Sequence, residues 1–397
     1  MHKKSEYEIR MAAIYSPKIL YYSAYTSIHT GSPRALIDLI TNIDAQRFRV
    51  CLMLPQEGEL GKTLEAIVRN IYIRKSMSLS TYTLAKFPIS VCSLLLFCVR
   101  HKIDLVHLNG AGWRESCLLA ARALNIPVVL HLHNPYPENE IRGNFNFSLA
   151  DRIIVVSESM KDNFRNHPRV LEKMVVIHNG VDLKDFHPRE PSVAPFHRDE
   201  RTFVIGFVGQ ISKRKGLGTL IEASPGIIAE YPHAIFVVVG SDAVGEAGLT
   251  KEMQELALKL GVSGHFSFLG KRNDIPEVMN WIDLLVVPSR AEPFGKVIIE
   301  GMACRKCVIA SRVGGIPEII KDGENGILVP PGDCERLEQS ILTMMRNKEL
   351  RMRLAESGYE TAKDRFAIQK VVEKTENLYM ELILDRGNKR RRGGAQQ

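Results

Sequence analysis

The sequence predicts an α/β protein with two doubly wound parallel sheets, each covered by helices on both faces. Short apolar runs alternate with stretches of helical period along most of the 397-residue chain, and this alternation is typical of parallel strands joined by helical crossovers. The apolar runs are continuous in Val, Ile and Leu, as expected of strands that are buried on both faces. A stretch rich in proline and charge, residues 188–201, interrupts the alternation and divides it into two series.

The first series predicts six strands and four helices. The apolar runs lie at residues 18–23, 49–54, 105–108, 127–132, 152–156 and 174–177, and the helical patterns lie at 33–43, 83–101, 112–124 and 158–166. Residues 87–99 are the most apolar stretch of the chain. A bilayer span needs about 20 apolar residues, so this stretch is expected to be a buried helix of the α/β layer.

The second series predicts six more strands, five helices between them and one long final helix. The strands are expected at residues 203–208, 234–239, 265–269, 284–287, 307–309 and 326–329, and the helices at 216–229, 249–260, 275–279, 295–303, 334–346 and 367–384. The predicted organisation is a first domain at 1–187, a linker at 188–201, a second domain at 202–366, a helix returning to the first domain at 367–385 and a disordered basic tail at 386–397. Two such sheets in tandem are expected to form a ligand cleft at the carboxyl ends of their strands.

The composition indicates a globular protein of a reducing compartment. Hydrophobic residues make up 45% and charged residues 25% of the chain, which excludes disorder of the whole chain and a disulfide-rich mini-protein. The seven cysteines are odd in number and scattered, and the first ten residues are polar, with no apolar leader segment after them. We therefore expect a cytoplasmic protein.

The net charge of +8 is concentrated in two parts of the chain. Residues 1–190 carry 24 Lys and Arg against 18 Asp and Glu, which gives +6, and residues 386–392 add five positive charges and no acid. This asymmetry favours an anionic substrate or surface. We expect an anionic membrane surface as a partner, with a merely solvated basic face as the alternative, and no nucleic acid.

Three familiar site patterns are missing or incomplete. No G-x-G-x-x-G follows a predicted strand, so the sequence does not support a dinucleotide site. Gly61-Lys62-Thr63 resembles the end of a phosphate loop, but Gln56 stands where the first glycine is required. Cys304 and Cys307 have no second pair of ligands at zinc-site spacing. We expect neither a metal site nor a bound cofactor.

The most informative block is 288–333, which contains Glu292 and Glu300. A strand is expected to end before Glu292, and Gly295 is expected to open a helix. The first-turn backbone N–H groups of that helix could bind a phosphate. Glu300 would lie about 7.5 Å further along the helix axis, where a carboxylate could accept hydrogen bonds from both hydroxyls of a ribose. The backbone donors of this turn belong to Phe294, Gly295, Lys296 and Val297.

This block resembles the C-terminal signature of the family-four glycosyltransferases, which are retaining enzymes with the GT-B fold of two Rossmann-like domains. The resemblance extends along nearly the whole chain. Similar segments are the first loop at 30–32, the strand-and-histidine segment at 104–107 and 127–133, the segment before the linker at 155–157 and 176–182 with Phe186, the strand and basic loop at 207–216, and the returning helix at 367–384.

The resemblance implies a role for each candidate site residue. Glu300 would hold the nucleotide ribose, Glu292 would contact the donor sugar, and Lys215 would pair with the diphosphate and offset its charge as the glycosidic bond breaks. His133 would lie near the reacting sugar; a core histidine at a strand end is the alternative. The implied catalytic residues are His133, Glu292 and Lys215, and the implied donor-binding residues are Gly31, Gly209, Gln210, Lys215, Phe294, Gly295, Lys296, Val297 and Glu300.

The chain departs from the family pattern at a few of these positions. Gln210 replaces a usual arginine, so one diphosphate cation is missing, and Arg214 or Lys213 could take its place. Ser32 stands where a second glycine usually follows Gly31. Lys296 replaces an apolar residue and could add positive charge to the phosphate turn.

The resemblance therefore implies a retaining transferase that moves a sugar from a nucleotide-diphosphate sugar to a glycan or lipid-linked acceptor. For a lipid-linked acceptor, we expect the protein at the inner face of the cytoplasmic membrane. Two alternatives remain open at this point. One is a nucleotide-sugar epimerase of the same fold, and the other is a catalytically idle scaffold, for which Gln210 is the only hint.

Overall fold

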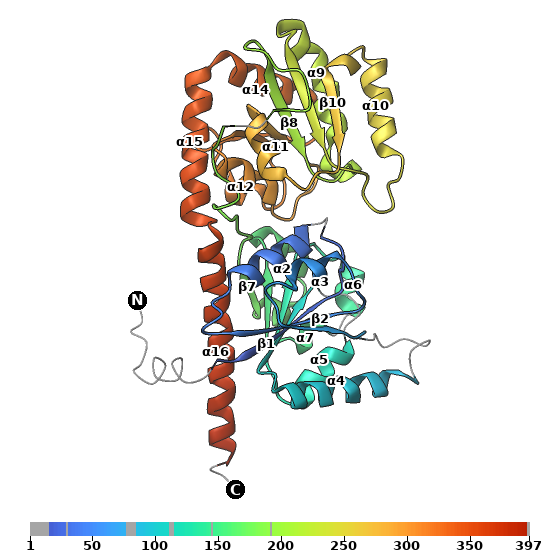
Figure 1. Ribbon diagram of the computed structural model, residues 1–397, viewed down its shortest axis with the longest axis vertical. Helices are drawn as coiled ribbons and strands as arrows, with labels where there is room; N and C mark the ends of the chain where they lie inside the picture. Colours follow the sequence, from blue (N-terminus) through green and yellow to red (C-terminus); the bar gives the residue numbers. More distant parts are fainter. Residues whose placement is uncertain are drawn as a thin grey trace. The chain divides into compact units, whose positions relative to one another are not determined.

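The computed structural model contains two compact units, each built around a parallel sheet (Figure 1). The structure describes residues 16–28, 31–76, 85–110, 115–143, 146–190 and 193–394. The first unit comprises the chain up to His178 together with the chain from Gln369, and the second unit runs from Asn179 to Ile368. The two sheets confirm the predicted α/β class with two doubly wound halves.

Seven parallel strands form the first sheet, in the order β3-β2-β1-β4-β5-β6-β7. From β1 to β3, and again from β4 to β7, each new strand is added further from the centre of the sheet. The direction in which strands are added therefore reverses between β1 and β4. Figure 1 shows α2 and α3 on one side of this sheet and α4 and α5 on the other. The strands are β1 Lys18–Ser23, β2 Arg49–Leu54, β3 Asn70–Ile73, β4 Leu105–Asn109, β5 Val128–Leu132, β6 Arg152–Val155 and β7 Met174–Val176. The helices are α2 Gly31–Asn42, α3 Glu59–Leu64, α4 Phe87–His101, α5 Glu115–Ala123, α6 Glu138–Gly143, α7 Asn146–Leu149, α8 Pro168–Leu171 and α16 Ile368–Gly394.

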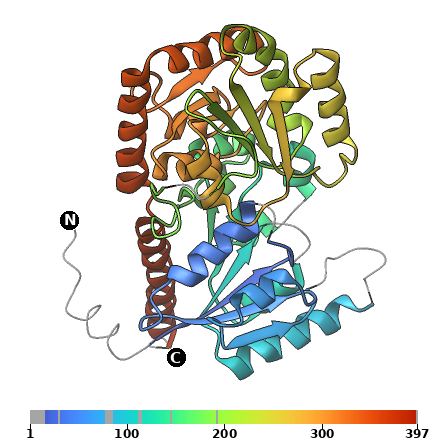
Figure 2. The same cartoon turned by 45° about the horizontal axis from the view of Figure 1, so that its top comes forward.

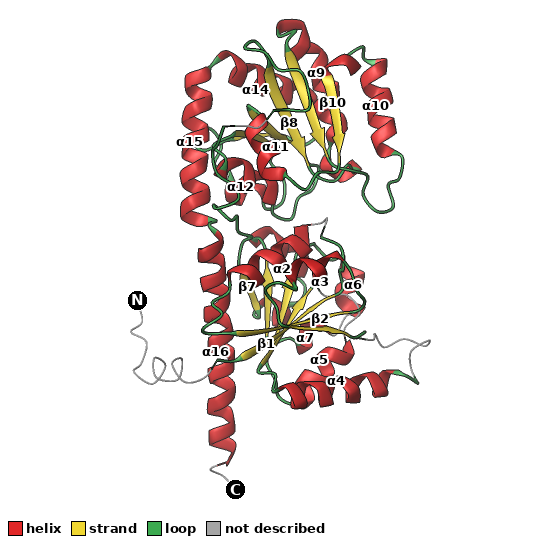
Figure 3. Ribbon diagram, in the orientation of Figure 1, coloured by secondary structure: helices red, strands yellow, loops and turns green. Residues whose placement is uncertain are grey.

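Six parallel strands form the second sheet, in the order β10-β9-β8-β11-β12-β13, with the reversal between β8 and β11. Helix α9 packs against α10 and α14, and α12 packs against α11 and α15, so helices lie on both sides of the strands (Figure 3). The strands are β8 Phe203–Val208, β9 Ala234–Val239, β10 Phe266–Gly270, β11 Leu284–Val287, β12 Cys307–Ser311 and β13 Ile327–Val329. The helices are α9 Leu217–Glu230, α10 Leu249–Lys259, α11 Ile275–Trp281, α12 Lys296–Ala303, α13 Ile316–Ile319, α14 Cys334–Arg346 and α15 Lys348–Arg365.

Several elements differ from those expected. Strand β3, the long helix α15 and the short helices α3, α6, α7, α8 and α13 were not predicted. The helix expected at 158–166 is a 3-10 helix at Glu158–Phe164. The helix expected at 83–101 begins at Phe87 in the structure, and residues 77–84 lie outside the described residues. Its burial also differs, because α4 exposes one apolar side to solvent.

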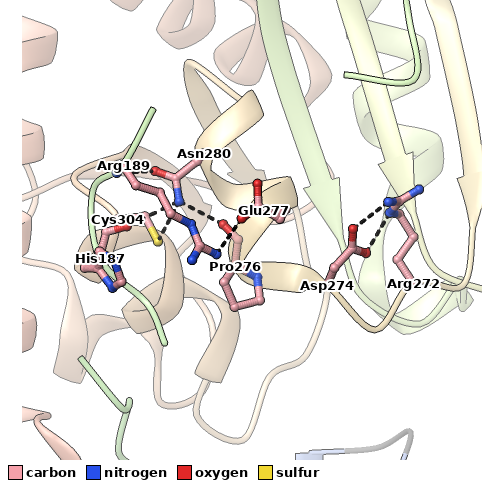
Figure 4. A network of polar contacts seen from close by, with 8 residues as sticks. All are labelled: His187, Arg189, Arg272, Asp274, Pro276, Glu277, Asn280 and Cys304. Atoms are coloured by element: carbon pink, nitrogen blue, oxygen red, sulfur yellow. Dashed lines mark hydrogen bonds and ion pairs between the residues drawn. The ribbon is translucent and has the colours of Figure 1, made fainter. Parts of the chain in front are cut away.

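The segment expected as a linker, 188–201, packs onto the second unit where it is described. The backbone N–H of Arg189 donates to Asn280 Oδ1 at 3.1 Å, and its guanidinium pairs with Glu277 at 2.8 Å. Asn280 Nδ2 donates to the carbonyls of His187 and Pro276 (Figure 4). Asn280 and Glu277 of helix α11 therefore hold the start of this segment.

The end of the chain also differs from the expected disordered tail. Helix α16 continues to Gly394, beyond the expected end of the helix at residue 385. Arg386 donates to the backbone carbonyls of Asp104 and Leu124 in the first unit, at 3.4 and 3.3 Å. Basic residues at a helix C-terminus are also favoured by the helix dipole, and both effects support the longer helix. Among the described residues, no helix has the length and apolar character needed to cross a membrane.

Candidate active site

Three loops meet at the carboxyl end of the second sheet, and they carry most of the candidate residues. They follow β8, β11 and β12, which are neighbours in the sheet. The loops after β8 and β11 flank the point where the strand order reverses, and ligands of doubly wound sheets bind at such points. The topology therefore places Lys215 and Glu292 at a binding position before any side-chain contact is considered.

The loop after β8 lies directly against the loop after β11. The backbone N–H of Arg290 donates to the carbonyl of Arg214 at 2.8 Å. Gly216 has a φ of +72°, and a Cβ atom built there would lie 2.0 Å from the carbonyl oxygen of Pro288. Only glycine permits this approach, because a side chain would collide with backbone that cannot rotate away.

Glu292 is almost buried and has three neighbours that stabilise its charge. Its Oε2 forms an ion pair with Lys215 Nζ, lies 3.8 Å from Arg214 Nη1, and accepts from Ser289 Oγ at 3.4 Å. The side chains of Glu292 and Lys215 are 8% and 16% exposed, so the pair is largely removed from screening by water. The arrangement holds an ionised carboxylate beside two cations.

The third loop supports the backbone of Glu292. The carbonyl oxygen of Glu292 accepts from the backbone N–H of Gly315 at 3.0 Å. Gly314 has a φ of +51°, and a Cβ built there would lie 2.0 Å from that same oxygen. Glu292 is thus held by its side chain from the β8 loop and by its backbone from the β12 loop.

Glu300 lies on α12, the helix that follows Glu292. Its side chain is 7% exposed and pairs with Lys296, one turn earlier, at 3.5 Å. Gly295 precedes the first residue of the helix, and no side chain caps that end. Phe294 is buried and packs edge-on against Phe366 at 5.8 Å between ring centroids, which anchors the start of the helix, and Val297 is half-buried.

Two further candidates follow β8. The backbone N–H of Gly209 donates to the carbonyl of Val239 at 2.9 Å, and a Cβ built at Gly209 would meet no atom within 4 Å. Gln210 is half-buried. Their position agrees with a donor-binding role, but no contact of Gln210 indicates a phosphate site.

His133 occupies the corresponding position in the first unit, at the carboxyl end of β5. Its Nε2 lies 2.7 Å from Asn109 Oδ1 at the end of β4, and Asn109 Nδ2 donates to Ser32 Oγ at 3.2 Å. The amide oxygen accepts, so His133 carries its proton on Nε2 in this arrangement. Gly31, at the start of α2, is exposed, and a Cβ there would meet no atom within 4 Å.

A second histidine packs against His133 with its ring tilted by 31° and stays neutral. The ring of His131 lies 4.1 Å from that of His133 between centroids. Burial lowers the pKa of His131 to about 3, because the charged imidazolium would lose its hydration. A neutral ring therefore supports His133 from inside the sheet.

The structure brings the predicted residues together in two groups, each described within its own unit. Lys215, Glu292, Lys296 and Glu300 share the end of the second sheet, and His133 lies with Gly31 at the end of the first. Sequence reasoning missed Asn109, Ser289 and Gly314. A polar residue directly after a predicted strand was the available signal for Asn109, and the Gly-Gly pair between the strands predicted at 307–309 and 326–329 was the signal for Gly314.

The two cysteines of the Cys304–Cys307 pair are buried in the second unit. Burial raises the pKa of each thiol to about 12, which disfavours the thiolate that metals bind. Cys304 directly follows α12, and its Sγ lies 3.9 Å from Asn280 Nδ2 (Figure 4). Within the described part of the chain, no group of three or more His, Cys, Asp or Glu residues could hold a metal ion.

Comparison with known proteins identifies the family of this site. Residues 189–361 match the model of the glycosyl transferases group 1, and residues 29–185 match that of glycosyltransferase family 4. The chain belongs to this glycosyltransferase family. The match of the group 1 model covers the loops of Lys215, Glu292 and Glu300, and the match of the family 4 model covers Gly31 and His133.

Relatives with high coverage support the assignment. The glycosyltransferase is 33% identical over 292 residues to an uncharacterized glycosyltransferase of Methanocaldococcus jannaschii, with 70% of this chain and 76% of the relative covered. It is 30% identical to spore coat protein SA of Bacillus subtilis, with 70% and 79% covered. A solved structure, Anabaena HepE in complex with UDP-glucose, superposes with a TM-score of 0.75 at 26% identity and covers 91% of this chain and 99% of its own.

Proposed function

We propose that this glycosyltransferase moves a sugar from a nucleotide-diphosphate sugar to a glycan or lipid-linked acceptor, with retention of configuration at the transferred carbon. The observation that carries the proposal is the nearly buried pair of Lys215 and Glu292 at the β8/β11 reversal, followed by Glu300 on the next helix. HepE, a structural relative, has been solved with UDP-glucose, and this supports a UDP-sugar as the first donor to test.

Each residue of the second unit would act on a different part of the donor. Glu300 would accept hydrogen bonds from the ribose hydroxyls. The first turn of α12, with Lys215 and Arg214, would stabilise the diphosphate as its charge grows. Glu292 would accept hydrogen bonds from sugar hydroxyls. The helix end and the cations could carry this charge without a metal ion.

The transfer would proceed on one face of the sugar. The bond between the sugar carbon and the diphosphate oxygen breaks, the acceptor oxygen bonds to that carbon from the same side, and the acceptor proton passes to the leaving diphosphate. No described residue is assigned as the nucleophile of a covalent intermediate, whereas the double-displacement scheme of glycoside hydrolysis requires one. His133 would lie near the reacting sugar and orient a hydroxyl through its ring.

The location proposed for this reaction is the cytoplasm, at the surface of the cytoplasmic membrane where the acceptor is lipid-linked. The basic first half of the chain, with its +6 charge, supports attraction to an anionic lipid surface.

Donor binding tests the proposal. Titration calorimetry with UDP, GDP and ADP should identify one nucleotide that binds, and Glu300→Gln should weaken it about tenfold or more, since a hydrogen bond to a charged group contributes about 1.5–3 kcal/mol. Glu335→Gln, an exposed glutamate of α14, is the matched control and should bind like the unmodified protein.

Product analysis then separates the alternatives. A retaining transferase should give a glycoside with the anomeric configuration of the donor, which NMR of the product reads directly. A donor epimerised without any acceptor would identify the epimerase instead, and the absence of nucleotide binding in a folded protein would leave only the idle scaffold.

A further inference from the structure

Helix α4 of the first unit exposes an apolar stripe that nothing in the proposed reaction uses. Phe87, Leu94, Phe97 and Cys98 are buried, but Ile89, Leu96 and Val99 are 69%, 66% and 55% exposed. The helix is therefore apolar on two sides, although only one of them packs on the protein. A soluble α/β layer needs only the inner side to be apolar.

The exposed residues form one continuous face. Ile89, Cys92, Leu96 and Val99 are all exposed, and their spacing of three, four and three residues confines them to an arc of about 80° around the helix at 3.6 residues per turn. Figures 1 and 2 both show α4 at the outer edge of the first unit, with α5 beside it. The fifteen-residue helix is about 22 Å long.

Positive charge surrounds this face, and negative charge is missing from its sequence. Residues 66–103 contain six Lys and Arg and no Asp or Glu. Lys86 directly precedes α4, Arg100 lies in its last turn and Lys102 directly follows it, and all three side chains are exposed. Arg74 bonds to Ser93 and lies over the ring of Phe97 at 5.5 Å, which adds a fourth cation beside the helix.

We propose that α4 is a membrane-docking helix that lies in the surface of an anionic bilayer. Ile89, Leu96 and Val99 would enter the region between headgroups and acyl chains, and Lys86, Arg100 and Lys102 would contact the lipid phosphates. An exposed apolar face with basic residues at both ends has the chemistry of helices that lie in a membrane interface. This inference rests on the proposed function for its purpose, since docking would bring a lipid-linked acceptor to the first unit.

The charges favour lipid over a second copy of this chain. In a symmetric dimer through α4, Lys86, Arg100 and Lys102 of each copy would lie close to those of the other, and like charges oppose such a contact. An anionic bilayer offers complementary charge over the whole length of the helix. It also offers an apolar phase for the stripe.

Vesicle co-sedimentation tests the docking helix in the full-length protein. Binding should appear with phosphatidylcholine vesicles that contain phosphatidylglycerol and weaken as salt rises. The double variant Ile89→Ser/Leu96→Ser should reduce the partition coefficient by at least about tenfold, since each apolar side chain would otherwise leave water on binding. Lys86→Gln/Arg100→Gln should also reduce it by about tenfold or more. Leu258→Ser is the matched control, because Leu258 of α10 is 68% exposed, like Leu96.

The rate at which maleimide alkylates Cys92 tests whether α4 itself contacts the vesicle. Cys92 is exposed within the stripe, and Cys334 is half-buried, while the other five cysteines are buried. In a Cys334→Ser background, anionic vesicles should therefore slow alkylation of Cys92 by maleimide at least several-fold. Unchanged alkylation of Cys92 in vesicle-bound protein would overturn the role of α4, and so would equal vesicle binding by the Ile89→Ser/Leu96→Ser variant. Protection of Cys92 that rises with protein concentration without vesicles would identify a second copy as the occupant and would also overturn the proposal.

The outcome is independent of the donor site. Nucleotide binding by the Ile89→Ser/Leu96→Ser variant should equal that of the unmodified protein, because α4 belongs to the first unit and Glu300 to the second. If this variant loses vesicle binding but keeps nucleotide binding, the result supports the docking role of α4. If the unmodified protein binds no nucleotide, the result contradicts the proposed function alone.

Discussion

Lys215 and Glu292 form an ion pair in which both side chains are largely removed from water. Burying two charges is costly, and their attraction offsets this cost only where the partners are well placed. Here Arg214 at 3.8 Å and Ser289 at 3.4 Å share the charge of the same carboxylate oxygen. A group of this kind is better explained by function than by stability, because apolar residues would fill the same place at lower cost.

The first prediction is that Lys215→Ala lowers turnover more than it lowers stability. The free energy of unfolding should fall by about 1–3 kcal/mol, because Glu292 keeps Arg214 and Ser289 as neighbours. Release of the nucleotide diphosphate from the donor should slow by about a hundredfold or more, since the cation that offsets the leaving charge is gone. Urea denaturation and a diphosphate-release assay measure the two effects.

The neighbouring Lys213 provides the comparison for Lys215. Lys213 lies in the same 3-10 turn but is exposed, so Lys213→Ala should keep stability and turnover close to those of the unmodified protein. A turnover of Lys215→Ala within about twofold of the unmodified protein, less than about 0.5 kcal/mol in the barrier, would contradict the role of Lys215. A large loss in Lys213→Ala would instead assign the leaving-group cation to Lys213.

At the scale of elements, the sequence predicts the strands and helices that bury many large apolar residues. It misses strands and helices that bury few of them. Strands β1, β2, β8, β9 and β11 have the expected bounds because they are continuous apolar runs. Strand β3 lies at the sheet edge, where none of its four residues is fully buried. Helix α15 buries mainly small residues, among them Ala355, Gly358 and Ala362, so its apolar period is faint.

The position of each site residue in the sequence explains which parts of the site could be predicted. Glu292, Gly295 and Glu300 stand in one short segment, so their spacing and a family resemblance indicated a site together. The contact of Lys215 with Glu292 joins positions 77 residues apart, and only the pairing of β8 with β11 creates it. The exposed apolar side of α4 could not be predicted, because the sequence pattern does not distinguish an apolar residue that faces solvent from one that faces the core.

The second prediction concerns the contact between the loops after β8 and β11. Gly216→Ala should lower the free energy of unfolding by about 3 kcal/mol or more, because the new Cβ would meet the Pro288 carbonyl at 2.0 Å and the backbone is left-handed. The loops would have to separate, and Lys215 would move with its loop. Nucleotide affinity and turnover should therefore fall together, as measured by calorimetry and by diphosphate release.

Gly261 is the matched control for Gly216. It has the same φ of +72°, but a Cβ there would meet no atom within 4 Å. Gly261→Ala should therefore cost only the left-handed conformation, about 1 kcal/mol, and leave nucleotide affinity unchanged. Equal losses of stability in the two variants would show that backbone conformation alone, and no contact between the loops, accounts for Gly216.

At the scale of the whole molecule, the first unit is discontinuous in the sequence. Its sheet is complete by Val176, yet α16 supplies part of its core from beyond residue 368. Tyr379 is fully buried, its hydroxyl lies 2.7 Å from His107 Nδ1, and its ring packs edge-on against Phe48 at 6.1 Å. The carboxylate of Glu376 accepts a hydrogen bond from the backbone N–H of Asp44 at 2.8 Å and forms an ion pair with Arg47 at 2.7 Å.

The last prediction follows from this discontinuity. A fragment of residues 179–368 should fold alone, with a cooperative urea transition, because it contains the whole second unit. A fragment of residues 1–178 should not, since it lacks the α16 side chains, and the loss of a buried aromatic residue alone costs about 3–5 kcal/mol, a large share of a domain's stability. Adding the 369–397 peptide should restore a cooperative transition.

The full chain provides a second test. Tyr379→Ala should lower the urea midpoint of the first unit only. Lys374→Ala changes an exposed residue of the same helix and should leave the urea midpoints of both units unchanged. A cooperative transition of the 1–178 fragment without the peptide would show that α16 is dispensable for this sheet.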